Sequence, residues 1–169
     1  PEPFPATVFE QVHPEMGDRV RAFAIQALGP VAGQRVWDLY AGIGETTAGL
    51  IAAGAAVESV ESDRRAVAEA EARGPAARRH TGRVEDLLAE LRRPDLVVTN
   101  PPRVGMDQRV TAELERVRPS RIVYVSCDPA TLARDLTRLP SYRIGKLQAF
   151  DLFPQTAHVE TVAVLEQGP

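Results

Sequence analysis

The feature that most constrains this chain is a repeated alternation of short apolar runs with segments of helical length. Runs such as "RVWDLY" at 35–40 and "RIVYVS" at 121–126 are typical of buried strands. Strands that alternate with helices predict an α/β fold, here a doubly wound, mostly parallel seven-stranded sheet with helices on both faces. The expected strands are 35–40, 56–61, 77–82, 95–100, 121–126, 142–150 and 158–165, and the expected helices are 15–28, 46–53, 64–72, 84–91, 107–116 and 129–139.

The length of 169 residues suits a single domain at 1–169, with an N-terminal entry segment and helix at 1–33 and a doubly wound core at 34–169. The chain opens with proline rather than methionine, so we expect a fragment of a longer protein. No apolar run approaches the roughly 18 residues that a membrane-spanning helix needs. A role in the membrane therefore has no support in the sequence.

Cysteine usage limits the compartment and the kinds of cofactor. A single cysteine cannot form an internal disulfide or a multi-cysteine metal site, and the three histidines have no clustered acidic ligands. We therefore expect a cytoplasmic protein with no bound metal. The net charge of −3 argues weakly against a free-standing nucleic-acid binder, because phosphate binding depends on clustered Lys and Arg.

A glycine turn, "DLYAGIGETT" from Asp38 onward, follows the first strand at the edge of the sheet where ligands bind in such folds. Gly42 and Gly44 let the backbone approach a ligand without a Cβ in the way. Glu61 ends the next strand, where a carboxylate can accept hydrogen bonds from both hydroxyls of a ribose. Together these residues predict an adenosine cofactor. Thr47 stands where a complete GxGxxG motif needs glycine, which disfavours a nicotinamide cofactor.

The fourth strand ends in "NPPRVG". Pro101 forces Asn100 out of helical geometry, and the two successive prolines stiffen the turn. The Asn100 amide can donate and accept hydrogen bonds at once, which suits the edge of a nucleobase or a conjugated amide. The alternative is a proline turn capped by an asparagine. Arg103 is expected to hold a phosphate or to orient carboxylates, and a structural salt bridge is the alternative.

The lone cysteine follows the fifth strand. Asp128 is a good N-cap and Pro129 is a preferred first helical residue, so Cys127 lies directly before a helix N-terminus. The positive end of a helix lowers a thiol pKa from its ordinary value of about 8.5. The sequence therefore predicts a nucleophilic thiolate at Cys127, and an inert core cysteine is the alternative.

Several motifs resemble one enzyme family. "FEQVHP", "DLYAGIG", "NPPRVG", "RIVYVSCDPATLARDL" and "DLFPQTAHVE" are similar to the catalytic domain of the bacterial RNA uracil-C5 methyltransferases, in the same order and over almost the whole chain. The resemblance implies a Rossmann-like class I methyltransferase fold and S-adenosylmethionine as cofactor. It also implies rRNA or tRNA as partner, with 5-methyluridine as the product.

The resemblance also assigns roles to individual residues. It implies that Cys127 is the catalytic nucleophile and that Glu160 in "HVE" is the general base. With the glycine turn, the expected cofactor-binding residues are Gln11, Asp38, Tyr40, Gly42, Gly44, Glu45, Glu61 and Asn100. Asn100 and Arg103 are expected at the substrate. Asn100 departs from the family's usual aspartate before "PPR", and Glu45 stands where a polar amide or a small residue is usual.

Two other functions remain open from the sequence. "NPP" followed by an aromatic residue marks methyltransferases that act on adenine or glutamine nitrogens, although Arg103 replaces the aromatic here. A non-catalytic domain that binds the cofactor or RNA would need neither Cys127 nor Glu160. In the family, an N-terminal RNA-binding domain helps to grip the RNA, and we expect this chain to lack it. We expect the chain to be a monomer.

Overall fold

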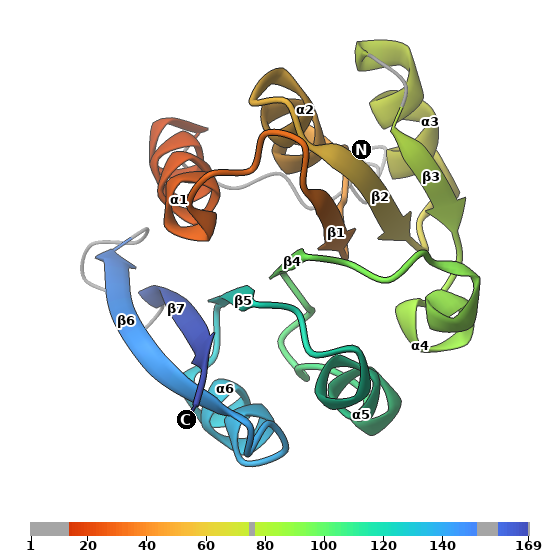
Figure 1. Ribbon diagram of the computed structural model, residues 1–169. Helices are drawn as coiled ribbons and strands as arrows, with labels where there is room; N and C mark the ends of the chain where they lie inside the picture. The colour runs from red at the N-terminus through yellow and green to blue at the C-terminus, as the bar shows by residue number, and fades with distance from the viewer. Residues whose placement is uncertain (1–13, 75–76, 152–158, 169) are drawn as a thin grey trace, which may run out of the picture.

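The computed structural model describes residues 14–74, 77–151 and 159–168. Its centre is a seven-stranded sheet in the order β3-β2-β1-β4-β5-β7-β6 (Figure 1). Four of the six pairings are parallel, and β7 runs antiparallel between β5 and β6. The predicted mostly parallel sheet is confirmed. The strands are β1 Arg35–Leu39, β2 Ala56–Glu61, β3 Arg78–Thr81, β4 Leu96–Thr99, β5 Arg121–Ser126, β6 Tyr142–Asp151 and β7 Val159–Gln167.

Helices cover both faces of this sheet, as the sequence predicts. Figure 1 shows α1 and α2 on one side and α4, α5 and α6 on the other. The helices are α1 Pro14–Leu28, α2 Glu45–Ala52, α3 Arg64–Arg73, α4 Val84–Leu87, the 3-10 helix η1 Leu88–Glu90, α5 Gln108–Val117 and α6 Pro129–Leu136.

Successive strand residues point to opposite faces, so each strand contributes to two cores. Val36 of β1 belongs to the cluster that contains Leu28 of α1 and Leu50 of α2. The next residue, Trp37, belongs to the cluster that contains Leu114 of α5. Each fully buried Leu or Val side chain contributes about 1.5–3 kcal/mol to stability. Burial on both faces explains why the central strands are continuous apolar runs rather than alternating ones.

Two of the predicted helices are shorter than expected. The stretch 84–91 forms the four-residue α4 and then the 3-10 helix η1, rather than one continuous helix. The helix expected at 129–139 ends at Leu136, and a bond from the Leu139 N–H to the Leu136 carbonyl (3.1 Å) closes a turn. Pro140 follows directly and disfavours helical geometry at Leu139, so the helix ends before it.

Among the described residues, no helix combines the length and the apolar character that crossing a bilayer demands. The same part of the chain contains no group of three or more His, Cys, Asp or Glu side chains placed to hold a metal ion.

Candidate active site

A cavity of about 1020 Å³ opens at the carboxyl edge of the parallel strands. Its lining combines the loops that follow β1, β2, β3 and β4 with parts of α1 and α6. Open α/β sheets bind ligands at this edge, so the cavity lies where the topology predicts. The predicted site residues that line it are Tyr40, Gly42, Glu45, Glu61, Asn100 and Arg103. Gln11, also predicted to bind the cofactor, lies outside the described residues.

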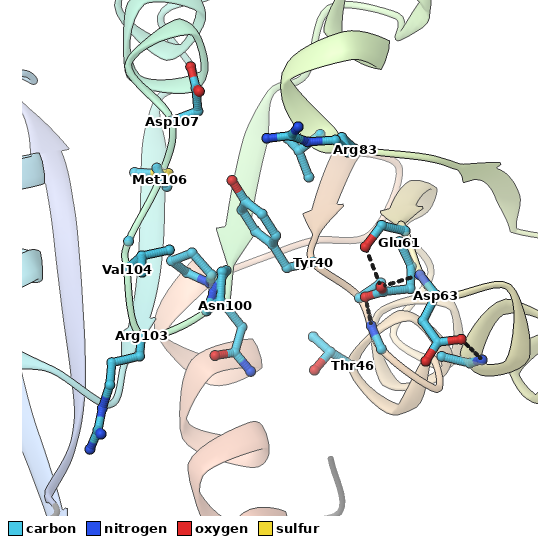
Figure 2. Close-up of a pocket in the computed structure, with 18 of the residues that line it drawn as sticks. Tyr40, Thr46, Glu61, Asp63, Arg83, Asn100, Arg103, Val104, Met106 and Asp107 are labelled. Carbon is cyan, nitrogen blue, oxygen red and sulfur yellow. Dashed lines mark hydrogen bonds between the residues drawn. The ribbon is translucent and has the colours of Figure 1, made fainter. Parts of the chain in front are cut away.

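Glu61 and the glycine turn are joined by hydrogen bonds (Figure 2). The Gly42 N–H donates to Glu61 Oε2 at 2.9 Å, and the Asp63 N–H donates to Oε1 at 2.8 Å. Oε1 also accepts from the Ser62 hydroxyl at 3.3 Å, whereas Oε2 has a second lone pair that leaves Glu61 acceptor capacity for the hydroxyls of a ligand. Gly42 has φ +56°, and a Cβ there would meet no protein atom within 4 Å. The backbone of the turn is therefore open to the cavity.

Gly44 has a different reason to be glycine. Its φ is +79°, and a Cβ would lie 2.8 Å from the Cβ of Ala70 in α3. A side chain here would strain the backbone and clash with the neighbouring helix. Gly44 therefore lets α2 begin against α3, and its predicted contact with the cofactor stays a prediction.

Asp38 is buried and lies behind the main cavity, in the lining of a second cavity of about 50 Å³. The Thr47 hydroxyl donates to Asp38 Oδ2 at 2.5 Å. Burial raises the pKa of Asp38 to about 7, and the charge of Glu61 adds to the rise. Thr47, which the sequence marks only as a missing glycine, is thus the partner that ties the first turn of α2 to β1. The contact of Asp38 with the cofactor stays a prediction.

Tyr40 occupies the left-handed region with φ +61°, which is uncommon for a residue other than glycine. Such backbone strain clusters at functional sites, where the surrounding structure enforces it. Figure 2 shows the ring directed into the cavity, between the loop after β4 and Arg83. Burial raises the pKa of the Tyr40 hydroxyl, and nearby carboxylates add to the rise. The hydroxyl is therefore a neutral hydrogen-bonding group near pH 7.

Glu45, at the mouth of the cavity, forms ion pairs with two arginines. Its carboxylate lies 2.7 Å from Arg21 of α1 and 3.6 Å from Arg73 of α3. Glu45 therefore links three helices across the cavity rim. Its predicted role in binding the cofactor stays a prediction.

Asn100 follows β4 and is exposed to the cavity, while its N–H donates to the Leu39 carbonyl at 3.1 Å. This bond fixes the start of the Pro-Pro turn against β1. Figure 2 shows the side chains of Asn100 and Arg103 on different sides of their loop. Asn100 points toward the side of Thr46, and Arg103 points away from it. The two predicted substrate residues therefore face different parts of the site.

Cys127 and Glu160 are brought together by the antiparallel pairing of β5 with β7. Ser126 pairs with Thr161, so the next residues along this register are Cys127, which directly follows β5, and Glu160, which directly precedes Thr161 on β7. The charge of Glu160 acts on the Cys127 thiol, whereas the lining of the main cavity includes neither residue. Cys127 is half-buried and Glu160 is buried. Asp128 caps α6 by accepting from the N–H groups of Ala130 (2.9 Å) and Thr131 (3.1 Å). The predicted place of Cys127, directly before a helix N-terminus, is confirmed.

The predicted lowering of the Cys127 pKa is wrong. Burial raises the pKa of the thiol, and the charges of Glu160 and Asp128 raise it further, against a backbone hydrogen bond and Arg103. Asp128 explains why the helix end does not prevail, because its carboxylate already satisfies the first N–H groups and adds a negative charge. Burial also raises the pKa of Glu160.

The model of the tRNA (Uracil-5-)-methyltransferase family matches residues 53–168. This chain belongs to that family. An uncharacterised RNA methyltransferase of Streptomyces coelicolor is 40% identical over 168 residues, covering 94% of this chain and 37% of that protein. The 23S rRNA (uracil(1939)-C(5))-methyltransferase RlmD of Chromobacterium violaceum is 36% identical over 181 residues, covering 99% of this chain and 35% of that protein.

A solved structure of the same kind confirms the fold of this uracil-5-methyltransferase family member. The tRNA (uracil-54, C5)-methyltransferase of Pyrococcus abyssi, in complex with S-adenosyl-L-homocysteine, superposes with a TM-score of 0.81 at 33% identity. The match covers 94% of this chain and 40% of that one. The family resemblance and the methyltransferase fold are thus confirmed. The chain spans less than half the length of these relatives.

One cluster in this family member was missed by sequence reasoning. Asp135 of α6 is fully buried, and its Oδ2 accepts from the Tyr124 hydroxyl and from the Met106 N–H, both at 2.7 Å. Its Oδ1 accepts from Arg134 at 2.8 Å and lies 3.5 Å from Arg138. The sequence signal is an aspartate between two arginines, in and just after the helix that follows Cys127. The cluster fastens the loop after β4 to that helix.

Proposed function

We propose that this chain is the catalytic region of an RNA uracil-C5 methyltransferase, which transfers a methyl group from S-adenosylmethionine to C5 of a uridine in rRNA or tRNA. The observation that carries the proposal is that Cys127 lies within reach of the charges of both Glu160 and Arg103, and that Arg103 lines a cavity suited to an adenosine. The chain covers less than half of its relatives. We therefore assign much of the binding of RNA to regions outside it. We also propose that the reaction takes place in the cytoplasm.

The residues of the cavity fit S-adenosylmethionine. The Glu61 carboxylate would accept hydrogen bonds from the ribose hydroxyls, and the open backbone at Gly42 leaves room for the cofactor beside it. Tyr40 and Asn100 would line its other end. When bound, the cofactor supplies an electrophilic methyl group on a sulfonium. This methyl group needs a carbon nucleophile, which an unmodified uracil does not offer.

Cys127 would create that nucleophile. Its sulfur, as the thiolate, adds to uracil C6, and the electron pair of the C5–C6 double bond moves toward O4, so that C5 becomes enolate-like and accepts the methyl group. Glu160 then removes the proton from C5, and the re-forming double bond expels the Cys127 thiolate. A positioned general base contributes about 10²- to 10⁴-fold to such a step. Burial raises the pKa of Glu160 toward neutral pH, which makes its carboxylate a stronger base.

Asn100 would stabilise the charge that builds on uracil O4 during addition of the thiolate. A neutral amide can donate to that oxygen, whereas an ionised aspartate can only accept. This difference predicts that Asn100→Asp changes the activity or the base preference. Kinetics on uridine RNA that are unchanged in this variant would remove Asn100 from the mechanism.

A methyltransferase that acts on amino nitrogens has less support. Its "NPP" motif is completed by an aromatic residue, and Arg103 occupies that place here. Transfer to an amino nitrogen needs neither a thiol nor a base opposite it. A non-catalytic binding domain likewise leaves the pairing of Cys127 with Glu160 without a purpose.

The direct test is mass spectrometry of the protein mixed with S-adenosylmethionine and RNA that contains 5-fluorouridine. Fluorine at C5 blocks the removal of a proton, so the reaction should stop at a covalent protein–RNA adduct. We expect an adduct at Cys127 that carries one added methyl group, and none with Cys127→Ala. The test is repeated with the full-length protein, and a full-length protein that binds the cofactor but forms no adduct with any uracil RNA would overturn the proposal.

A further inference from the structure

Large apolar side chains are strongly exposed at three places in the described part of the chain. They are Val104, 71% exposed, Leu147, 57% exposed, and Ile144, 49% exposed. Leu147 and Ile144 lie on β6, at the edge of the sheet. Val104 instead lies on the rim of the active-site cavity. Exposed apolar residues scattered singly are ordinary, so the setting of Val104 decides whether its exposure has a purpose.

Val104 is held by bonds on both sides of its turn. The Gly105 N–H donates to the Pro102 carbonyl at 2.8 Å, which closes the turn. Arg134 of α6 donates to the carbonyl of Val104 itself at 2.7 Å, and the Met106 N–H donates to Asp135 at 2.7 Å. The peptide groups next to Val104 are therefore fastened to α6, the helix that follows the nucleophile.

Gly105 shows how closely this turn is seated. Its φ is +78°, and a Cβ there would lie 2.5 Å from both Arg134 Nη2 and Asp135 Oδ2. Gly105 and Met106 are buried, while Val104 directly before them is exposed. The turn thus presents its apolar side chain outward on a fixed backbone, and Val104 cannot turn inward unless these bonds break.

The position of Val104 relates it to the reacting groups. It follows Arg103, whose charge acts on the Cys127 thiol, and it is four residues beyond Asn100. Figure 2 shows Val104 between Arg103 and Met106 on the loop that borders the cavity. A uridine that enters the site must leave its neighbours in the RNA stack, and the gap it leaves has to be filled or closed. Apolar side chains that insert between bases stabilise such unstacked states.

We propose that Val104 is an apolar wedge that enters the RNA stack where the target uridine has swung out. The proposal rests on the proposed function, since only a reaction at a flipped base needs a wedge. The clamp by Arg134 and Asp135 gives the wedge its rigidity. A clamped side chain enters the stack without first losing the freedom of a mobile loop.

The test compares Val104→Ser with wild type on two forms of the RNA segment recovered from the 5-fluorouridine adduct. One form is folded, and the other has the stem disrupted so that the uridine is unpaired. We expect Val104→Ser to lower kcat/KM on the folded RNA by about 10- to 100-fold. The loss should largely disappear on the unpaired RNA, because no stack has to be opened. Val104→Ile, which keeps an apolar side chain, should be as active as wild type on both RNAs. Leu147→Ser, a comparable polar change at an exposed site on β6, should also have no effect.

A fluorescence measurement keeps the wedge separate from the methylation chemistry. With 2-aminopurine placed next to the target uridine, binding of the wild-type protein should raise the emission as the base unstacks, and Val104→Ser should reduce this rise. An equal loss on both RNAs, or an unchanged emission rise in Val104→Ser, would overturn the wedge while leaving the proposed function intact. Wild-type protein that methylates neither RNA would overturn both.

Discussion

The two ends of the active edge are built in different ways. At the cofactor end, between β1 and β2, Glu61 is already hydrogen-bonded to the backbone at Gly42 and Asp63. At the end where we propose that catalysis takes place, between β5 and β7 and called the catalytic end below, burial raises the pKa of both Cys127 and Glu160. The charge of Glu160 raises the pKa of Cys127 further. The first end is arranged for a ligand in advance, whereas the second holds a buried carboxylate whose charge opposes ionisation of the thiol.

Both ends hold their residues in position, but at the catalytic end position alone does not make the thiol reactive. The parallel strands and glycine turn set positions through hydrogen bonds from backbone N–H groups to the Glu61 carboxylate. The antiparallel pair sets positions equally well, but it leaves the thiol in its less reactive, protonated form in the free protein. We infer that binding of the substrate, with donors such as Asn100 and Arg103 near the developing charge, completes the activation of the thiol.

The largest effect should come from the catalytic end. Cys127→Ala should abolish methyl transfer, and Glu160→Gln should lower turnover by about 10²- to 10⁴-fold because proton removal loses its base. The two variants should fail at different steps, with no RNA adduct in the first and a methylated RNA adduct that accumulates in the second. Denaturing gels and mass spectrometry on uridine RNA distinguish them. Full turnover by Glu160→Gln would assign the base to another residue.

A substitution at the cofactor end should weaken cofactor binding without changing the reactivity of Cys127. Glu61→Gln replaces a charged acceptor, and hydrogen bonds to charged groups contribute about 1.5–3 kcal/mol. We expect S-adenosylmethionine to bind about 10- to 100-fold more weakly in calorimetry, while alkylation of Cys127 by iodoacetamide is unchanged. Glu71→Gln, an exposed carboxylate on α3, is the matched control and should bind normally. Equal affinities in the wild-type protein and Glu61→Gln would remove the ribose contact from the mechanism.

Asp38 makes stability depend on pH at the cofactor end. Its pKa rises from 3.8 to about 7 on folding, so between these values the folded protein binds more protons than the unfolded chain. The free energy of unfolding should therefore fall as the pH rises from about 4 to about 7. Asp38→Asn should flatten this slope in thermal melts over that range. A slope that persists in the variant would assign the effect to another buried acid, with Glu160 the first candidate.

The smallest effect concerns the charges around the thiol. Burial, the main cause of the raised Cys127 pKa, is retained in Glu160→Gln, but the added contribution of the carboxylate is lost. The pH midpoint of alkylation should therefore move down in Glu160→Gln and up in Arg103→Gln. Midpoints that stay at the wild-type value in both variants would show that neither charge acts on the thiol.

The sequence predicted the sheet well because both faces of its central strands are buried, which leaves a clear apolar signal. It also predicted the places of Glu61 and Cys127, since Glu61 ends β2 and Cys127 directly follows β5 at the ligand edge. The direction of the Cys127 pKa shift could not be predicted correctly from the sequence. The helix N-terminus is visible in the residues "CDP", but the burial of the thiol and the approach of Glu160 depend on how β7 pairs with β5.

The cluster at Asp135 could not be predicted for a related reason. Its partners come from β5, from the loop after β4 and from α6, so no local spacing reports them. The bond from Thr47 to Asp38 was not predicted either, because a motif that expects glycine says nothing about what another residue contributes. In both cases the missing information is a side-chain hydrogen bond between different elements of the fold.

The position of β7 has a consequence in time. It is the last strand of the sheet in the sequence, yet it lies between β5 and β6. As the chain leaves the ribosome, β6 emerges before the strand that joins it to the sheet, while β1, β2 and β4 are already available to pair. A growing chain thus gains the place for its cofactor before it gains Glu160. A chain whose synthesis has not reached β7 therefore lacks the proposed base, even where the strands around the cofactor site have already paired.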